Sequence, residues 1–228
     1  MRVLYHWPLD PGSRQVRLAL AEKGLKFDLQ HVSPFEEDLE LLTLNPAGLP
    51  PVLVEDRPQA EGGRAVIVET RAILEYLDDT QPDTALLPSD PIERAEVRRL
   101  ASWFDRKFEA EVNAYLLAEK LEKRLAGGGS PDMAAIREGR DFLRWHCGYL
   151  NGLLEAREGL AGPRFTLADI AAAAHLSAID YLGDIGWEHY PALKAWYERV
   201  KCRPAFRPLL KDRLPGVPPA RWYAALDF

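Results

Sequence analysis

The sequence predicts a small mixed α/β domain followed by an all-helical domain. Three observations favour this class: strand and helix patterns alternate over the first 80 residues, a proline-rich stretch follows, and later segments have helical spacing. The 228 residues are enough for two domains with their own cores. We therefore expect a first domain at 1–80, a linker at 81–90, a helical domain at 91–205 and a C-terminal tail at 206–228.

The first domain is expected to follow the order β-α-β-α-β-β-α. The apolar run "RVLYHW" predicts a strand, and Ser13 is expected to cap the helix that follows and ends at Gly24. "KFDLQHV" alternates as a strand does, while "PPVLVED" and "AVIVET" predict an antiparallel pair. "TRAILEYLDDT" returns to helical spacing, with Ile73, Tyr76 and Leu77 on one side.

The second domain is expected to begin with a long helical run over 92–125 that bends or breaks and ends at three glycines. The next helix is expected to begin with Ser130 as its cap. Thr166 and Asp169 have the spacing of a capping box before a strongly apolar helix. The proline-rich tail is predicted to pack on, or extend from, the helical domain rather than to form another helix.

The charge and cysteine content narrow the class of protein. A net charge of -6 argues against a nucleic-acid binder, and the two cysteines, Cys147 and Cys202, suggest a reducing compartment without a disulfide framework. The sequence shows neither a signal-peptide pattern nor a long apolar run, so a cytoplasmic protein without membrane insertion is expected. The basic segment "ERVKCRPAFRPLLKDR" is interpreted as a solvated surface.

Three segments, in order, resemble the cytosolic glutathione transferase superfamily over about the first 210 residues. They are "NPAGLPPVL", "VETRAILEYL" and "FTLADI". The resemblance implies a thioredoxin-like N-terminal domain, a C-terminal helical bundle and a cis peptide bond before Pro51. It also implies a homodimer, with Phe35 and residues 71–75 near the contact.

The same resemblance implies a glutathione site at Pro51, Glu69 and Thr70, where Glu69 and Thr70 hold the γ-glutamyl carboxylate. The alternative is that Glu69 and Thr70 only begin a helix. In the family, the residue before the cis proline pairs its backbone with the cysteinyl residue of the ligand. Here that residue is Pro50, which has no N–H to donate, so we expect weakened glutathione binding.

A thiolate-stabilising donor is also missing from its expected place. Asp10 aligns with the catalytic serine or cysteine of the family, and an ionised aspartate only accepts hydrogen bonds and would raise the pKa of a nearby thiol. Tyr5 and Ser13 are alternative donors, and His6 and Trp7 are candidates to fill the pocket. We therefore assign no catalytic residue, expect no metal and no cofactor, and keep glutathione as a structural ligand as an alternative.

The tail carries Trp222, Tyr223, Leu226 and Phe228, which either pack on the helical domain or form a protein-binding surface. This tail resembles that of a transferase-like branch of bacterial division proteins that bind FtsZ. The resemblance implies a homodimer that binds FtsZ filaments and regulates cytokinesis at the division site. The expected partner contacts are Glu119, Arg124, Leu125 and Asp227. Two alternatives remain: a solvated helix end, and a transferase that conjugates glutathione to small electrophiles.

Overall fold

The computed structural model describes residues 1–58 and 60–228, which form two compact units, Met1–Ala85 and Leu86–Phe228. The first unit contains a four-stranded sheet in the order β2-β1-β3-β4. Strand β1 pairs in parallel with β2 and antiparallel with β3, and β3 pairs antiparallel with β4. The strands are β1 (Arg2–His6), β2 (Asp28–His31), β3 (Val52–Asp56) and β4 (Arg64–Val68).

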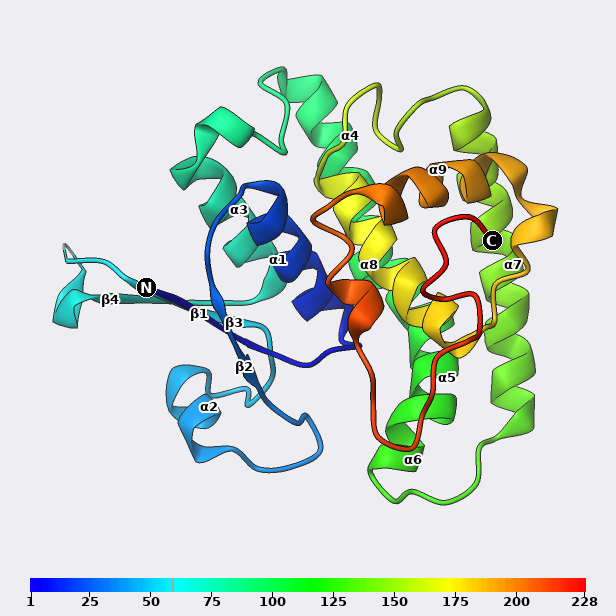
Figure 1. Cartoon of the computed structure of the whole chain (residues 1–228), viewed down its shortest axis with the longest axis horizontal. Helices are drawn as coiled ribbons and strands as arrows, with labels where there is room; N and C mark the ends of the chain where they lie inside the picture. The colour runs from blue at the N-terminus through cyan, green and yellow to red at the C-terminus, as the bar shows by residue number, and fades with distance from the viewer. Residues whose placement is uncertain (59) are drawn as a thin grey trace. The chain divides into compact units, whose positions relative to one another are not determined.

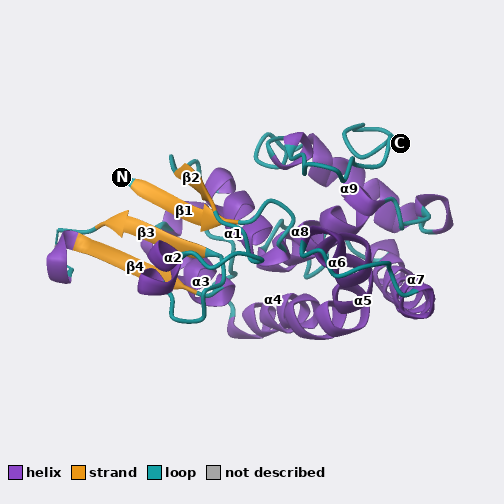
Figure 2. Cartoon of the chain, turned by 90° about the horizontal axis from the view of Figure 1, so that it is seen from below, coloured by secondary structure: helices purple, strands orange, loops and turns teal. Residues whose placement is uncertain are grey.

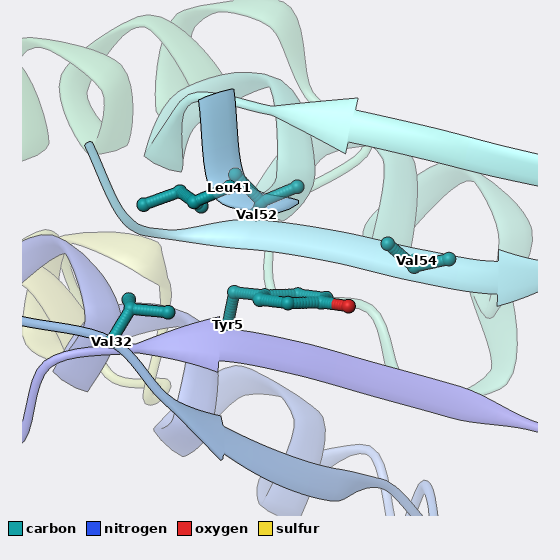
Figure 3. Close-up of a cluster of buried hydrophobic side chains, with 5 residues drawn as sticks. All are labelled: Tyr5, Val32, Leu41, Val52 and Val54. Atoms are coloured by element: carbon teal, nitrogen blue, oxygen red, sulfur yellow. The ribbon is translucent and has the colours of Figure 1, made fainter. Parts of the chain in front are cut away.

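Helices cover both faces of this sheet. Helices α1 and α3 pack together on one face and α2 lies on the other (Figure 1). On the α2 side, Tyr5, Val32 and Leu41 pack with Val52 and Val54 of β3 (Figure 3). The predicted order of elements and the antiparallel pair are confirmed. The helical segments of this unit are α1 (Pro11–Glu22), α2 (Leu39–Leu44), η1 (Glu61–Gly63), α3 (Thr70–Thr80) and η2 (Pro82–Thr84).

The beginning of α1 differs from the prediction, because Asp10 and not Ser13 is its N-cap. The Asp10 carboxylate accepts a hydrogen bond from the Ser13 backbone N–H at 2.6 Å. Pro11 takes the first helical position, where a missing N–H costs nothing, so the helix begins three residues earlier than expected. The edge strand β2 is also confirmed as a strand, but all four of its residues are exposed, so its alternating sequence does not produce alternating burial.

All the secondary-structure elements of the second unit are helical (Figure 2). The predicted long run is continuous from residue 91 to residue 125 and includes two π-helical segments, η3 and η4. The next helix is capped by Asp132 and not by Ser130, because its carboxylate accepts from the N–H groups of Ala134 and Ala135. The segments are α4 (Pro91–Ser102), η3 (Trp103–Asn113), α5 (Ala114–Leu117), η4 (Ala118–Glu122), α6 (Lys123–Leu125), α7 (Met133–Glu155), α8 (Leu167–Leu182), η5 (Trp187–His189), α9 (Pro191–Cys202) and η6 (Leu209–Lys211).

Helix α8 forms the core of the helical unit, with α4, α5, α7 and α9 arranged around it (Figures 1 and 2). Every residue from Leu167 to Tyr181 is buried. The predicted capping box is confirmed. The Thr166 side chain accepts from the Asp169 backbone N–H, and the Asp169 carboxylate accepts from the Thr166 backbone N–H. Gly183 ends the helix in the left-handed region with φ of 75°.

The tail is ordered against the helical unit. The Tyr181 hydroxyl donates to the Val217 carbonyl at 2.6 Å, and the Ala220 N–H donates to the Tyr181 carbonyl at 2.9 Å. Tyr223 is fully buried, whereas Trp222 is 40% exposed, so the tail both packs on the unit and presents an aromatic surface. Within the part of the chain that the structure describes, no helix is long and apolar enough to span a membrane.

Candidate ligand and partner sites

The expected glutathione site of the first unit is assembled around Gly12. A Cβ atom added at Gly12 would lie 2.4 Å from the Thr70 hydroxyl, 3.3 Å from an Asp10 carboxylate oxygen and 3.3 Å from the Pro51 ring. The fold therefore brings Asp10, Pro51 and Thr70 together where the first helix begins. The peptide bond between Pro50 and Pro51 is cis, as the resemblance implies.

Glu69 occupies an unusual backbone conformation at the same place. It is the N-cap of α3 and, among residues 1–58 and 60–228, the only non-glycine residue with a positive φ, at 73°. Such a conformation costs of the order of 1–3 kcal/mol and is found most often at ligand sites. Together with Thr70 and the N-terminal N–H groups of α3, it forms an arrangement suited to an anion.

The two alternative thiolate donors are both engaged within the unit. The Tyr5 hydroxyl donates to the Glu40 carboxylate at 2.5 Å, and this bond, with burial, raises the pKa of Tyr5 to about 12. Ser13 is fully buried, and its hydroxyl accepts from the Trp7 backbone N–H at 3.2 Å. The Tyr5 proton is therefore already used within the unit, and the Ser13 hydroxyl lies in fully buried surroundings. The Trp7 ring packs against His31 and Phe35.

Replacing Pro50 by valine is expected to strengthen glutathione binding by about 10- to 100-fold. The variant supplies one backbone N–H to a ligand carbonyl that otherwise stays unpaired, which is worth roughly 1–3 kcal/mol. Calorimetric titration with reduced glutathione up to millimolar concentrations tests the prediction: binding should become measurable in the variant, whereas the wild type gives only a lower limit for its dissociation constant. Pro46→Val, in the same loop, is the matched control and should leave the affinity unchanged. Equal affinities for Pro50→Val and the wild type would contradict the prediction.

Three of the four expected partner residues lie together at the end of the long helical run. Glu119 accepts hydrogen bonds from Lys123 at 2.9 Å and from the Asp132 backbone N–H at 2.7 Å, so it also holds the loop after α6. Arg124 is exposed and Leu125 is half-buried. The Arg124 guanidinium would lie 4.0 Å from a Cβ at Gly216, which places this helix end beside a turn of the tail (Figure 1).

Asp227 lies at the other end of the tail. Its side chain is exposed, and the neighbouring Phe228 ring packs edge-on against Trp187 with a centroid distance of 5.2 Å. The expected partner residues thus form two groups, one beside α6 and one beside the chain end. The tail itself connects them (Figure 1).

A cavity of about 620 Å³, not anticipated from the sequence, opens between these two groups. Asp184 in its wall is nearly fully buried and bonds both Lys120, next to Glu119, and Arg140 of α7. Phe228, next to Asp227, also lines the cavity. The sequence gives no signal for this cavity, because its walls come from four separate segments. They are Arg140 of α7, the connection at 183–188, Lys194 of α9, and Trp222 and Phe228 of the tail.

A buried ion pair anchors the tail beside this cavity. The Lys201 ammonium lies 3.3 Å from the Asp180 carboxylate, and both side chains are fully buried. Asp180 also accepts from the indole N–H groups of Trp187 and Trp222, and Lys201 lies 3.9 Å from the centre of the Phe228 ring. The interpretation of "ERVKCRPAFRPLLKDR" as a solvated surface is therefore wrong at Lys201.

The fold and the site together define a class of protein. A four-stranded sheet with a cis proline beside two helix N-termini, followed by a helical unit, is the arrangement of the thioredoxin-like two-domain transferases. Residues 4–85 match the family model of the glutathione S-transferase N-terminal domain, and residues 114–199 match that of the C-terminal domain. The chain belongs to the glutathione S-transferase family.

Relatives at high identity cover the whole chain. FtsZ-localized protein A of Caulobacter vibrioides (strain NA1000 / CB15N) is 56% identical over 227 residues, covering 100% of this chain and 98% of the relative. The solved structure of FzlA from C. crescentus has a TM-score of 0.96 at 56% identity, covering 100% and 99% of the two chains. A glutathione S-transferase from Rhodospirillum rubrum F11 has a TM-score of 0.95 at 47% identity, with both chains covered completely.

Proposed function

We propose that this protein binds FtsZ filaments and regulates cytokinesis from the cytoplasm, at the division site. The observation that carries the proposal is the 56% identity, over the full chain, to a relative named for its localization with FtsZ. The match covers 100% of this chain, so it includes the tail, where the aromatic surface and Asp227 lie.

In this proposal the protein acts through a protein-binding surface and not through catalysis. Arg124, Leu125 and Asp227 are the proposed contacts with FtsZ, while Glu119 contributes by holding the loop after α6 in place. The impaired clamp at Pro50 and the engaged hydroxyls of Tyr5 and Ser13 support a role without glutathione turnover.

Charge reversal at Arg124 or Asp227 is expected to abolish co-sedimentation with FtsZ filaments. Both side chains are exposed, so the melting temperature should stay unchanged and the loss should report on binding alone. Arg164→Glu and Asp141→Lys, at exposed charged positions elsewhere on the unit, are matched controls and should sediment normally. Normal sedimentation of both Arg124→Glu and Asp227→Lys would refute the proposed contacts.

We also propose that the protein is a homodimer whose contact includes the aromatic face of α4, η3 and α7. Trp145 is 53% exposed and stacks on Trp103 and Tyr149, and Lys107 lies over both indole rings. A stacked, exposed aromatic group of this kind is typical of interface anchors.

Light scattering is expected to give a mass about twice the 25.7 kDa of one chain. Trp145→Arg should reduce that mass to one chain, because a charge replaces the aromatic contact. Met133→Arg, at another exposed apolar position of α7, is the control and should remain dimeric. A dimeric Trp145→Arg variant would show that this face is not the contact.

A second candidate function is conjugation of glutathione to small electrophiles. Two observations favour it: the Rhodospirillum rubrum relative bears the name of a transferase, and Thr70 and Pro51 both lie beside Gly12, with Glu69 as the N-cap of α3. The two candidates differ in the glutathione affinity that they require, which a titration of the wild-type protein measures directly.

A further inference from the structure

We propose that the cavity between the tail and the connection from α8 to α9 binds a small aromatic carboxylate. Its volume of about 620 Å³ lies within the range of sites that enclose small organic ligands, roughly 300–1,000 Å³. The site lies entirely in the second unit and shares no residue with the glutathione site around Gly12. It does not depend on binding to FtsZ.

The apolar part of the cavity suits a flat ring. The indole of Trp222 is 40% exposed and the ring of Phe228 is half-buried, so both offer aromatic surface to a ligand. Ile185 adds an aliphatic contact, and Gly183 and Gly186 contribute backbone without side chains. Aromatic groups gain affinity beyond area burial when they stack or meet edge-on with other rings.

The polar part of the cavity favours an anion. Buried Asp184 is bonded by two cations, Lys120 and Arg140, so this group of three keeps a net positive charge. Arg140 bonds Asp184 through Nε and Nη2, which leaves its Nη1 amino group to bind a carboxylate.

A second cation reinforces this preference. Lys194 lies 5.3 Å from the centre of the Phe228 ring, at the cavity wall, and its pairing with Glu198 is loose at 3.8 Å. Glu188, the other acid of the wall, is 72% exposed and lies 3.3 Å from His189. A ring flanked by one carboxylate therefore matches the cavity in both shape and charge.

Occupancy of the cavity should also hold the tail in place. Two of the walls, Trp222 and Phe228, belong to the tail, so a ligand binds only the docked arrangement and stabilises it. The tail also gives a direct readout: a bound ligand should slow tryptic cleavage after Arg221, an exposed residue of the tail.

The test is a calorimetric titration of the full-length protein with 1-naphthoate and with its neutral counterpart, 1-naphthalenemethanol. We expect one site per chain for naphthoate, weaker binding of the alcohol and slower tryptic cleavage after Arg221 with naphthoate present. Lys194→Met keeps the apolar stem but removes the charge, so it should weaken naphthoate binding about tenfold and leave the alcohol unaffected. Trp222→Ala should weaken both ligands by about tenfold or more. Met133→Ala, at an exposed apolar position outside the cavity, should weaken neither.

Absence of naphthoate binding to the wild type would overturn the proposal. Binding that is unchanged in both Lys194→Met and Trp222→Ala would overturn it equally, because the ligand would then lie elsewhere. If Trp222→Ala lowers the melting temperature strongly, Lys194→Met decides, since that side chain is partly exposed and makes only a loose ion pair.

Discussion

Replacing Lys201 by methionine is expected to lower the free energy of unfolding by about 3–5 kcal/mol. The substitution removes the cation from a fully buried pair and leaves the Asp180 carboxylate uncompensated. Burial raises the pKa of Asp180 and lowers that of Lys201, so each charge depends on the other. The Lys201 ammonium also lies 3.4 Å from the Trp222 carbonyl, so the tail should loosen as well.

Urea unfolding measures the loss of stability, and tryptic cleavage after Arg221 measures the release of the tail. Lys194→Met, on the same helix but partly exposed, is the matched control and should change stability by less than about 0.5 kcal/mol. The double variant Asp180→Asn, Lys201→Met should lose less stability than the sum of the two single variants. Each single variant leaves one buried charge without its partner, whereas the double variant removes both charges. A loss below about 1 kcal/mol for Lys201→Met would show that the pair does not hold the tail.

Replacing Asp169 by alanine is expected to cost about 3 kcal/mol or more. Its buried carboxylate accepts four hydrogen bonds: from the backbone N–H groups of Leu160 and Thr166, from the Thr166 hydroxyl and from the indole of Trp196. All four donors lie in buried surroundings, so they lose their partner without gaining water. The substitution also removes the capping box at the beginning of α8, the core helix of the unit.

Thr166→Ala is the informative comparison for Asp169→Ala. It removes the cap of the same helix but not the bonds to Leu160 and Trp196, so its expected cost is only about 1 kcal/mol. Thermal and urea unfolding of both variants give the two values. Similar losses for the two variants would mean that the bonds outside the capping box contribute little.

Features that depend on local sequence could be predicted, and the capping box shows why. The side chains of Thr166 and Asp169 accept hydrogen bonds from each other's backbone N–H group within one helical turn. Their spacing in the sequence is therefore sufficient to predict the beginning of the helix. The order of elements along the first unit was equally accessible, because alternating patterns and turns are local signals. The N-caps at Ser13 and Ser130 were predicted wrongly. An aspartate lies near each serine, Asp10 in the first case and Asp132 in the second, and the sequence alone does not decide whether the serine or the aspartate caps the helix.

Features that depend on tertiary packing were out of reach. Lys201 lies in a strongly basic segment, and only the fold shows that its ammonium is enclosed by Asp180 and the tail. The cavity beside it is assembled from segments that are far apart in the chain, so no single motif signals it. Asp180, an acidic residue in the apolar sequence of α8, was the available hint to a buried ion pair, because a buried charge requires a partner.

The measurement that tests the central claim most directly is a calorimetric titration of the wild-type protein with reduced glutathione up to millimolar concentrations. The claim is that this protein acts through its surface, because Pro50 cannot donate a hydrogen bond, the Tyr5 hydroxyl donates to Glu40 and Ser13 is fully buried. We predict no detectable heat and no matching thermal stabilisation. Micromolar binding would contradict the claim and favour glutathione conjugation as the function of this protein.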